Sequence, residues 1–310
     1  MKKYSALLVI LGSALWGTDA LFRRPLTGVL SPVTIVLLEH CVLSLVTLPV
    51  VTKFRREFLC LKGRDLASLL VIALGGSVAA TILFTFAMKY GNPSAVILLE
   101  KTQPLFTVLL AGVILSERPT RRFWPWFAAA MAGSYLVSAP DWHAGLGQNP
   151  GHPVVVLSAI GAAVLWGSAT VCGRYLVSKI SVPFLTSLRF ILALPALAIL
   201  YWLQPARQQD LPTGISPICS VVAMALIPGL AALLLYYKGL QSTTASLASV
   251  CELAFPVTAV AVNWLVLNVR LSNSQFLGSA ALVASVTILA YRNAREQSQV
   301  PHAGSKPTRP

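Results

Sequence analysis

Charged residues are scarce in this chain. Of its 310 residues, 11% are charged and only 10 are Asp or Glu, whereas 56% are hydrophobic. The mean hydropathy is +0.73. A soluble globular domain carries about 25% charged residues, because its surface has to be solvated. The composition therefore excludes an ordinary soluble fold and predicts an integral membrane protein.

Motifs for catalysis, nucleotide binding and metal binding are also missing. The sequence contains no H-E-x-x-H, no G-x-S-x-G and no G-x-x-x-x-G-K-[ST] motif, which disfavours a zinc hydrolase, a serine hydrolase and direct ATP drive. Its five cysteines form no C-x-x-C pair and predict neither a disulfide framework nor a metal site. We expect no catalytic residues, no metal and no cofactor. An intramembrane enzyme remains the alternative of another class.

Long apolar stretches are what the sequence has in abundance. A helix needs about 20 mostly apolar residues to cross a bilayer, and ten segments approach or meet this length, of which 123–139 is the shortest. The segments cover residues 4–22, 31–52, 66–87, 94–114, 123–139, 154–177, 183–203, 216–237, 243–268 and 274–291. The sequence therefore predicts an all-α integral membrane protein with ten transmembrane helices.

The distribution of basic residues predicts the orientation. With the N-terminus in the cytoplasm, 17 of the 24 Lys and Arg residues fall in cytoplasmic segments and 5 in outside loops. This asymmetry is typical of the positive-inside rule, so the net charge of +14 does not indicate nucleic acid. We expect a multi-pass protein of the bacterial inner membrane, in contact with the lipid bilayer, with both termini in the cytoplasm.

Two stretches of the sequence recur. Ala14–Leu26 (ALWGTDALFRRPL) resembles Val164–Leu176 (VLWGSATVCGRYL) at an offset of 150 residues, and Val96–Val108 resembles Ala248–Val260 at an offset of 152. Each half then holds five helices. Because five is odd, the second half enters the membrane from the opposite side, which predicts two inverted five-helix repeats.

Composition divides the chain further. We expect repeats at residues 1–139 and 154–291, separated by a Gly- and Pro-rich periplasmic linker at 140–153 that lacks Lys and Arg. The segment 292–310 is polar and rich in Pro, Ser and Gln, which predicts a disordered cytoplasmic tail.

A glutamate precedes a proline by four residues in both halves. Proline has no N–H for the carbonyl four residues back, so Pro104 frees the carbonyl of Glu100 and Pro256 frees that of Glu252. Broken helices are tolerated in membranes where they face protein or a watery cavity. We expect both glutamates to line a central site. The alternative is a kink in which a neighbouring helix neutralises each glutamate.

Other ionisable residues lie within apolar segments, where they are costly. Lys101 is about 100° around a helix from Glu100, so the two need not pair. It is expected to meet a substrate anion or an acidic group of another helix, and a purely structural internal ion pair is the alternative. Glu39 and Arg189 occupy matching places and predict either a gate across the repeats or a static ion pair. His40 is most simply hydrogen-bonded within its helix.

The segment after the first LWG motif has its own charges. Asp19 and Arg23 are spaced for an i,i+4 ion pair, which is the favoured reading over a substrate contact for Asp19. Trp16 and Trp166, each followed by glycine, are able to stack on a substrate ring or cation. Core packing is the alternative for both tryptophans.

The chain resembles the drug/metabolite transporter superfamily, and within it the ten-helix EamA-type transporters. The resemblance rests on the two LWG helices, on Pro104–Arg118 and on its weaker echo Pro256–Arg270. It implies a central cavity built from the first, third, fourth, sixth, eighth and ninth predicted helices. That cavity would be lined by Trp16, Asp19, Glu100, Lys101, Trp166 and Glu252. The echo has Val269 in place of Glu117, which argues against a transport role for Glu117.

The function we expect is secondary transport of a small metabolite by alternating access. Four intramembrane acids against two unambiguous cations favour a cationic or zwitterionic solute, such as an amine or amino acid. Protons are the plausible coupling ion, carried by Glu100 or Glu252, and the resemblance implies export. An uncoupled facilitator and a cationic-drug exporter are alternatives. Small-residue stretches such as Ala128–Ser134 and Gly278–Ser285 predict tight helix packing and allow a homodimer.

Overall fold

The computed structural model describes residues 4–138, 152–205, 211–267 and 272–299, and over these ranges the chain contains helices and no strands. Within them, nine helices are long and apolar enough to cross a membrane. The fifth predicted segment, 123–139, forms the 16-residue helix α8, Phe123–Ser138, which is not among the nine. At 1.5 Å per residue this helix is about 24 Å long, short of the roughly 30 Å hydrocarbon core. The predicted all-α membrane fold is confirmed, whereas the tenth crossing stays a prediction.

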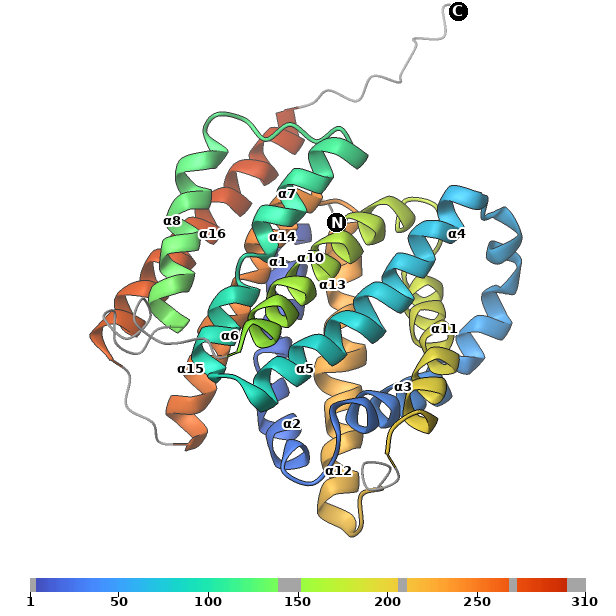
Figure 1. The fold of residues 1–310 in the computed structure, drawn as a ribbon. Helices are drawn as coiled ribbons and strands as arrows, with labels where there is room; N and C mark the ends of the chain where they lie inside the picture. The colour runs from blue at the N-terminus through green and yellow to red at the C-terminus, as the bar shows by residue number, and fades with distance from the viewer. Residues whose placement is uncertain (1–3, 139–151, 206–210, 268–271, 300–310) are drawn as a thin grey trace, which may run out of the picture.

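Helices are interrupted in both halves (Figure 1). The first half holds α1 (Ser5–Trp16), α2 (Asp19–Thr27), α3 (Pro32–Phe54), η2 (Arg55–Cys60), α4 (Gly63–Leu70), η3 (Val71–Ala79), α5 (Ala80–Tyr90), α6 (Pro93–Glu100), α7 (Gln103–Ile114) and α8. The second holds α10 (Pro153–Leu176), α11 (Val182–Trp202), α12 (Ile215–Met224), η5 (Ala225–Ala231), α13 (Ala232–Leu240), α14 (Ala245–Glu252), α15 (Ala254–Leu267) and α16 (Asn273–Gln299). Two interruptions recur in both halves, the π segments η3 and η5 and the breaks after α6 and α14, whereas the break between α1 and α2 has no counterpart in the continuous α10.

Local sequence fixes where several helices begin. Ser31 caps α3, because its Oγ accepts a hydrogen bond from the backbone N–H of Thr34 at 3.1 Å, and Pro32 follows as the first helical residue. Thr244 caps α14 in the same way, accepting from the N–H of Leu247 at 3.2 Å. Such caps satisfy backbone donors that a helix start leaves free. They define the ends of the helices that carry the site.

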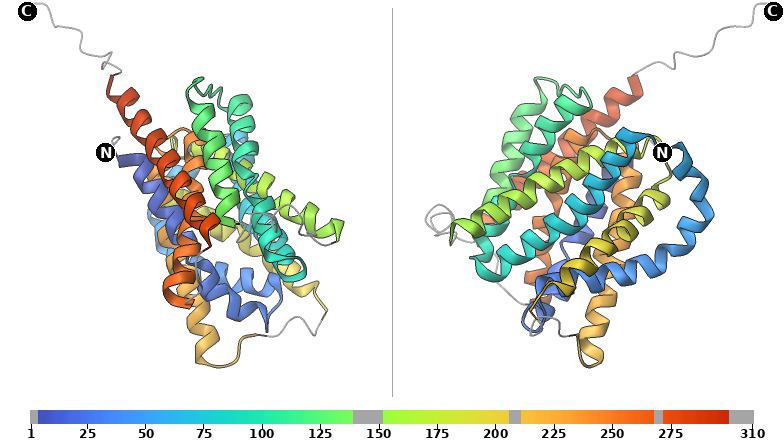
Figure 2. Two further views of the ribbon diagram at one scale, coloured as in Figure 1. Left: turned by 90° about the vertical axis from the view of Figure 1, so that its left-hand side faces the viewer. Right: turned by 45° about the vertical axis from the view of Figure 1, so that its right-hand side comes forward.

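The first helix of each half packs on the other half. Helix α1 contacts α13, α14 and α15, whereas α10 contacts η3, α5 and α7. Figure 2 shows α10 and α5 running side by side. Matching helices also pair with each other, α3 with α11 and α8 with α16. Two copies of one five-helix unit related by a two-fold axis would give this reciprocal pattern.

The glycine after each LWG tryptophan allows the two halves to approach closely. A Cβ on Gly17 would lie 2.7 Å from Cβ of Thr258, at the start of α15, and one on Gly167 would lie 3.0 Å from Oγ1 of Thr107, on α7. Cβ atoms rarely tolerate contacts this short. Each glycine therefore seats its helix against a broken helix of the opposite half.

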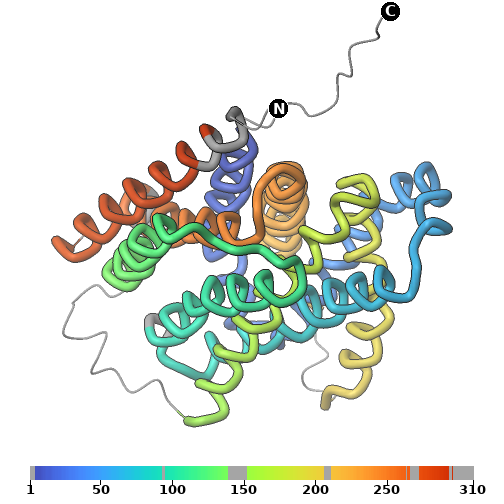
Figure 3. The backbone as a smooth tube through the Cα atoms, turned by 90° about the horizontal axis from the view of Figure 1, so that it is seen from above, coloured from blue at the N-terminus to red at the C-terminus, as the bar shows by residue number. Residues whose placement is uncertain are grey.

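Helices α8 and α16 form a separate layer at one edge of the molecule (Figures 1 and 3). They cross at two glycines, since a Cβ on Gly133 would lie 2.9 Å from the carbonyl oxygen of Gly278, and one on Gly278 would lie 2.7 Å from that of Gly133. The small-residue stretches predicted to mediate close packing therefore contact each other within one chain. They no longer argue for a homodimer.

The structure describes only parts of the predicted C-terminal tail and of the predicted linker. Helix α16 runs to Gln299, so the prediction that disorder begins at Arg292 is wrong for residues 292–299, where the polar sequence continues a helix. Residues 300–310 lie outside the described ranges. So does most of the predicted linker, 139–151, while His152 caps α10 through its Nδ1, 3.4 Å from the N–H of Val154.

Candidate functional site

Two broken helices meet near the centre of the fold. Helix α6 ends at Glu100 and α7 begins at Gln103, while α14 ends at Glu252 and α15 begins at Ala254. The structure thus has a break directly after each glutamate, next to Pro104 and Pro256. Helices α7 and α14 pack against each other, which brings the two breaks together from opposite halves.

The carboxylate of Glu252 is held by uncharged donors. Its Oε1 accepts from the hydroxyl of Tyr236 at 2.5 Å and from Oγ1 of Thr170 at 3.2 Å. Its Oε2 accepts from Nε2 of Gln103 at 2.5 Å, and the hydroxyl oxygens of Thr170 and Tyr236 lie 3.1 Å apart. These partners come from α7, α10 and α13, so this one carboxylate ties together both halves of the chain.

Glu100 is neutralised in a different way. Its Oε2 lies 2.6 Å from Nζ of Lys101, and both side chains are buried. The ammonium also lies 4.0 Å from the ring centroid of Phe255 at the other break, a favourable cation–π distance. The sequence argument for separating Glu100 from Lys101 assumed a continuous helix. The helix ends at Glu100, so that 100° spacing no longer applies and the adjacent residues pair.

The two LWG tryptophans make equivalent ring contacts. Trp16 lies against Tyr236, with ring centroids 5.0 Å apart, and Trp166 lies against Phe84 at 5.3 Å. Extending the offset of 152 residues back along the chain aligns Phe84 with Tyr236. Trp16 thus packs on α13 and Trp166 packs on α5, each in the opposite half. Both rings contribute to packing between the halves.

The same alignment explains why the two glutamates differ. Each polar partner of Glu252 corresponds to an apolar residue of the other repeat: Tyr236 to Phe84, Thr170 to Ala20 and Gln103 to Phe255. Glu100 therefore lacks the hydrogen-bond donors that surround Glu252. Lys101 supplies a charge instead, where Glu252 is followed by Leu253.

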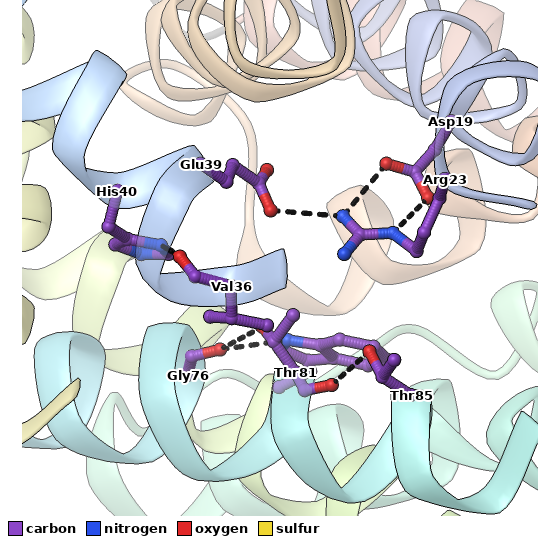
Figure 4. A network of polar contacts seen from close by, with 9 residues as sticks. Asp19, Arg23, Val36, Glu39, His40, Gly76, Thr81 and Thr85 are labelled. Atoms are coloured by element: carbon purple, nitrogen blue, oxygen red, sulfur yellow. Dashed lines mark hydrogen bonds and ion pairs between the residues drawn. The ribbon is translucent and has the colours of Figure 1, made fainter. Parts of the chain in front are cut away.

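A second polar cluster lies between α2 and α3 (Figure 4). The predicted pair is present, with Nε of Arg23 2.6 Å from Oδ2 of Asp19. Nη2 of Arg23 also lies 3.0 Å from Oε2 of Glu39. One guanidinium thus serves two carboxylates, and the structure pairs Glu39 with Arg23 rather than with Arg189. His40 contacts the carbonyl of Val36 through Nδ1 at 2.9 Å, a bond within its own helix.

Arg189 donates hydrogen bonds to η3 in the first half and to α13 in its own half. Its Nε donates to Oγ of Ser77 at 2.6 Å, and its Nη1 donates to the hydroxyl of Tyr237 at 3.1 Å. Ser77 belongs to the π-helical segment η3, and the neighbouring carbonyl of Gly76 accepts from Nε1 of Trp166 at 3.0 Å (Figure 4). A π turn frees backbone groups from the regular ladder, and here another helix uses one.

Sequence reasoning identified the glutamates but missed their partners. Gln103, Thr170 and Tyr236 are uncharged, and no single one of them stands out in an apolar helix. The repeat alignment contained the signal, because each is polar where the other copy is apolar. The π segments η3 and η5 were also missed. They end at matching residues, Ala79 and Ala231, without a shared motif.

Comparison with known proteins agrees with this architecture. The sequence model of the EamA-like transporter family matches the chain twice, at residues 3–139 and 154–291. A crystal structure with 21% sequence identity has the same fold, with a TM-score of 0.74 over 95% of this chain and 100% of that one.

The sequence similarity to two named relatives extends over most of the chain. The riboflavin transporter ImpX of Fusobacterium nucleatum is 27% identical over 93% of this chain and 98% of its own length. An uncharacterized transporter of Archaeoglobus fulgidus is 23% identical over 93% of this chain and 99% of its own length. Both relatives are named as transporters. With its apolar helices and two family matches, this chain belongs to the EamA-like transporter family and is a multi-pass membrane transporter.

Proposed function

We propose that this protein is a secondary transporter that exports a small metabolite across the bacterial inner membrane by alternating access. The observation that carries the proposal is Glu252, a carboxylate at a helix break held by neutral donors from both halves. A carboxylate at membrane depth is costly by several kcal/mol, so its position favours a functional role. Movement of the halves would have to remake these bonds, which couples the site to the cycle.

The proposed cycle relies on two inverted repeats. The two matches to one family model, the breaks after Glu100 and Glu252, and the reciprocal packing of α1 and α10 support this relationship. Inverted repeats can exchange conformations, which would open a midplane site first to one side and then to the other.

The charges around the site bear on the solute. Arg23 forms ion pairs with Asp19 and Glu39 and is therefore counted with the intramembrane cations. The four acids, Asp19, Glu39, Glu100 and Glu252, are then balanced by three cations, Arg23, Lys101 and Arg189, instead of the two expected from the sequence. The excess of negative charge is thus one, which favours a zwitterion or a neutral polar solute over a strongly cationic drug. Amino acids and amines remain the first classes to test.

Riboflavin is a second candidate solute. The observation that favours it is the similarity to the riboflavin transporter ImpX along almost the whole of both chains. The aromatic pairs at the site, Trp16 with Tyr236 and Trp166 with Phe84, are chemically suited to a planar ring, and the donors on Glu252 are suited to hydroxyl groups.

A binding screen followed by flux would test the proposal. The purified protein would be heated with amino acids, amines, nucleobases, sugars or riboflavin, and a bound solute should raise the melting temperature. The solute found would then be loaded into vesicles containing the protein. We expect it to cross the membrane chemically unchanged. Chemical turnover of the solute, or no flux above that of protein-free vesicles, would contradict the proposal.

Proton coupling needs its own experiment. The hydroxyls of Tyr236 and Thr170 are able to donate or accept, so their rotation would accommodate a proton on Glu252. If Glu252 carries the proton, an imposed pH gradient should accelerate flux in wild type and have no effect in Glu252→Gln. Equal acceleration in Glu252→Gln and Glu100→Gln would rule out both carriers, and an absence of acceleration in wild type would favour a facilitator.

A further inference from the structure

Glu117 links the first half to the start of α14. Its Oε1 accepts from the N–H of Ala245 at 2.8 Å, and its Oε2 accepts from the N–H and the hydroxyl of Ser246 at 3.0 and 2.7 Å. A carboxylate at a helix N-terminus satisfies free donors and is favoured by the helix dipole. Helix α14 ends at Glu252, about 12 Å further on. Glu117 therefore holds the helix that carries the central carboxylate.

Two more carboxylates of the first half accept hydrogen bonds from the second half. Asp65 on α4 accepts from Nζ of Lys179 through Oδ1 at 2.5 Å, and Glu57 accepts through Oε2 from the N–H of Ser181 at 2.7 Å. Lys179 and Ser181 lie between α10 and α11. In all three links the acceptor belongs to the first half and the donor to the second.

These links lie at the helix ends that carry most of the basic residues. We call this end the basic face and define it by residues 53–64, 116–122, 177–181 and 238–246. At the opposite end, Oγ of Ser31 and Oε1 of Gln204 link the halves through neutral side chains. The charged links are thus concentrated at one end of the central site.

These hydrogen bonds are strong, but water can replace them. Hydrogen bonds to a carboxylate are stronger than those between neutral groups, yet Lys179 is 40% exposed whereas Asp65 is 3% exposed, so water can replace the ammonium contact. The hydrogen bonds that the ammonium donates to Asp65 and to the hydroxyl of Tyr175 raise the pKa of Lys179. The ammonium therefore stays protonated at neutral pH.

We propose that Glu57, Asp65 and Glu117 form a gate that closes the basic face, and that all three must release together for the central site to open there. This inference rests on the proposed transport cycle. Glu117 is a positioning residue, because it acts on Glu252 through α14. The absence of a glutamate at Val269, its counterpart, makes the gate specific to one end of the molecule.

Hydrogen exchange in the full-length protein in lipid nanodiscs tests the gate without any solute. In Glu117→Gln, the amides of Ala245 and Ser246 should exchange about tenfold faster, because a charge-assisted bond is lost. The amide of Ser181, which Glu117 does not touch, should accelerate as well. The matched control is Arg118→Gln, since Arg118 is exposed and adjacent.

A second variant separates a gate from a helix cap. Asp65→Asn does not alter the α14 cap, so faster exchange at Ala245 and Ser246 in this variant would support joint release. Acceleration confined to the bond that each variant removes, or no acceleration, would overturn the proposal. Because no solute is involved, failure of the gate leaves the flux experiments on the proposed function unaffected.

Discussion

At the scale of the residue, the repeats stabilise two equivalent carboxylates by different means. Glu252 receives hydrogen bonds from Gln103, Thr170 and Tyr236, whereas Glu100 forms an ion pair with Lys101. A charge bound only by neutral groups can exchange them for a solute or a proton more readily than one in a buried ion pair. We therefore propose that Glu252 contributes most to substrate binding and that the Glu100–Lys101 pair has a supporting electrostatic role.

The hydroxyl of Tyr236 is predicted to matter more than its ring. Tyr236→Phe keeps the contact with Trp16 but removes a donor to Glu252, and the resulting ring is what Phe84 provides in the other half. Loss of one hydrogen bond to a charged group costs about 1.5–3 kcal/mol, so flux should fall at least about tenfold, with a moderate drop in melting temperature in protein that remains folded. Wild-type flux in Tyr236→Phe would show that the hydroxyl is dispensable.

The Glu100–Lys101 pair is predicted to be structural on its own. Lys101→Leu, which installs the residue found after Glu252, leaves Glu100 buried without its cation. Breaking a buried pair in this way costs about 3–5 kcal/mol, which thermal unfolding would detect as a large drop in melting temperature. The double variant Lys101→Leu with Glu100→Gln removes both charges and should recover most of that stability. A single variant as stable as wild type would refute this assignment.

Individual residues were only partly predictable from the sequence. The Glu-x-x-x-Pro spacing located both breaks, because proline acts locally on its own helix. The spacing of Asp19 and Arg23 likewise predicted their pair. The partners of Glu39 and Arg189 were not predictable, because they depend on how separate helices pack. Glu117 was discounted for lacking a counterpart, although its contact is with the opposite half.

At the scale of the element, interrupted helices distinguish this fold from a simple bundle. The predicted segments 4–22, 94–114 and 243–268 are each built from two helices, and the segments 66–87 and 216–237 contain π segments. The approximate positions of the nine long apolar helices follow from hydropathy, since burial in lipid requires length and apolarity. The π segments do not, because each reflects local contacts such as that of Trp166 with Gly76.

The LWG glycines provide a test at this scale. Gly17→Ala and Gly167→Ala would each place a Cβ within 3.0 Å of the opposite half, and overpacking of this kind costs about 1–3 kcal/mol. We expect lower melting temperatures and reduced flux for both. Gly63→Ala is the matched control, because a Cβ there meets nothing within 4 Å. If the Gly17 and Gly167 variants behaved like this control, the close approach of the halves would be wrong.

At the scale of the whole molecule, polar links cross between the halves at the centre and at the basic face. At the centre, Gln103 of the first half donates to Glu252 of the second. At the basic face, Glu117 binds the other end of the same helix, α14. A movement of α14 would therefore alter both the hydrogen bonds of Glu252 and those of Glu117. This connection between an end of the molecule and its central carboxylate is what alternating access requires.

The most direct test of this account is the flux of the identified solute through vesicles containing Glu252→Gln. The substitution preserves side-chain size and removes the charge, and Arg118→Gln, at an exposed arginine, serves as the control. The account predicts wild-type flux in Arg118→Gln and a loss of flux in Glu252→Gln in protein that remains folded. Flux at the wild-type rate in Glu252→Gln would contradict the claim that this carboxylate is the centre of the transport site.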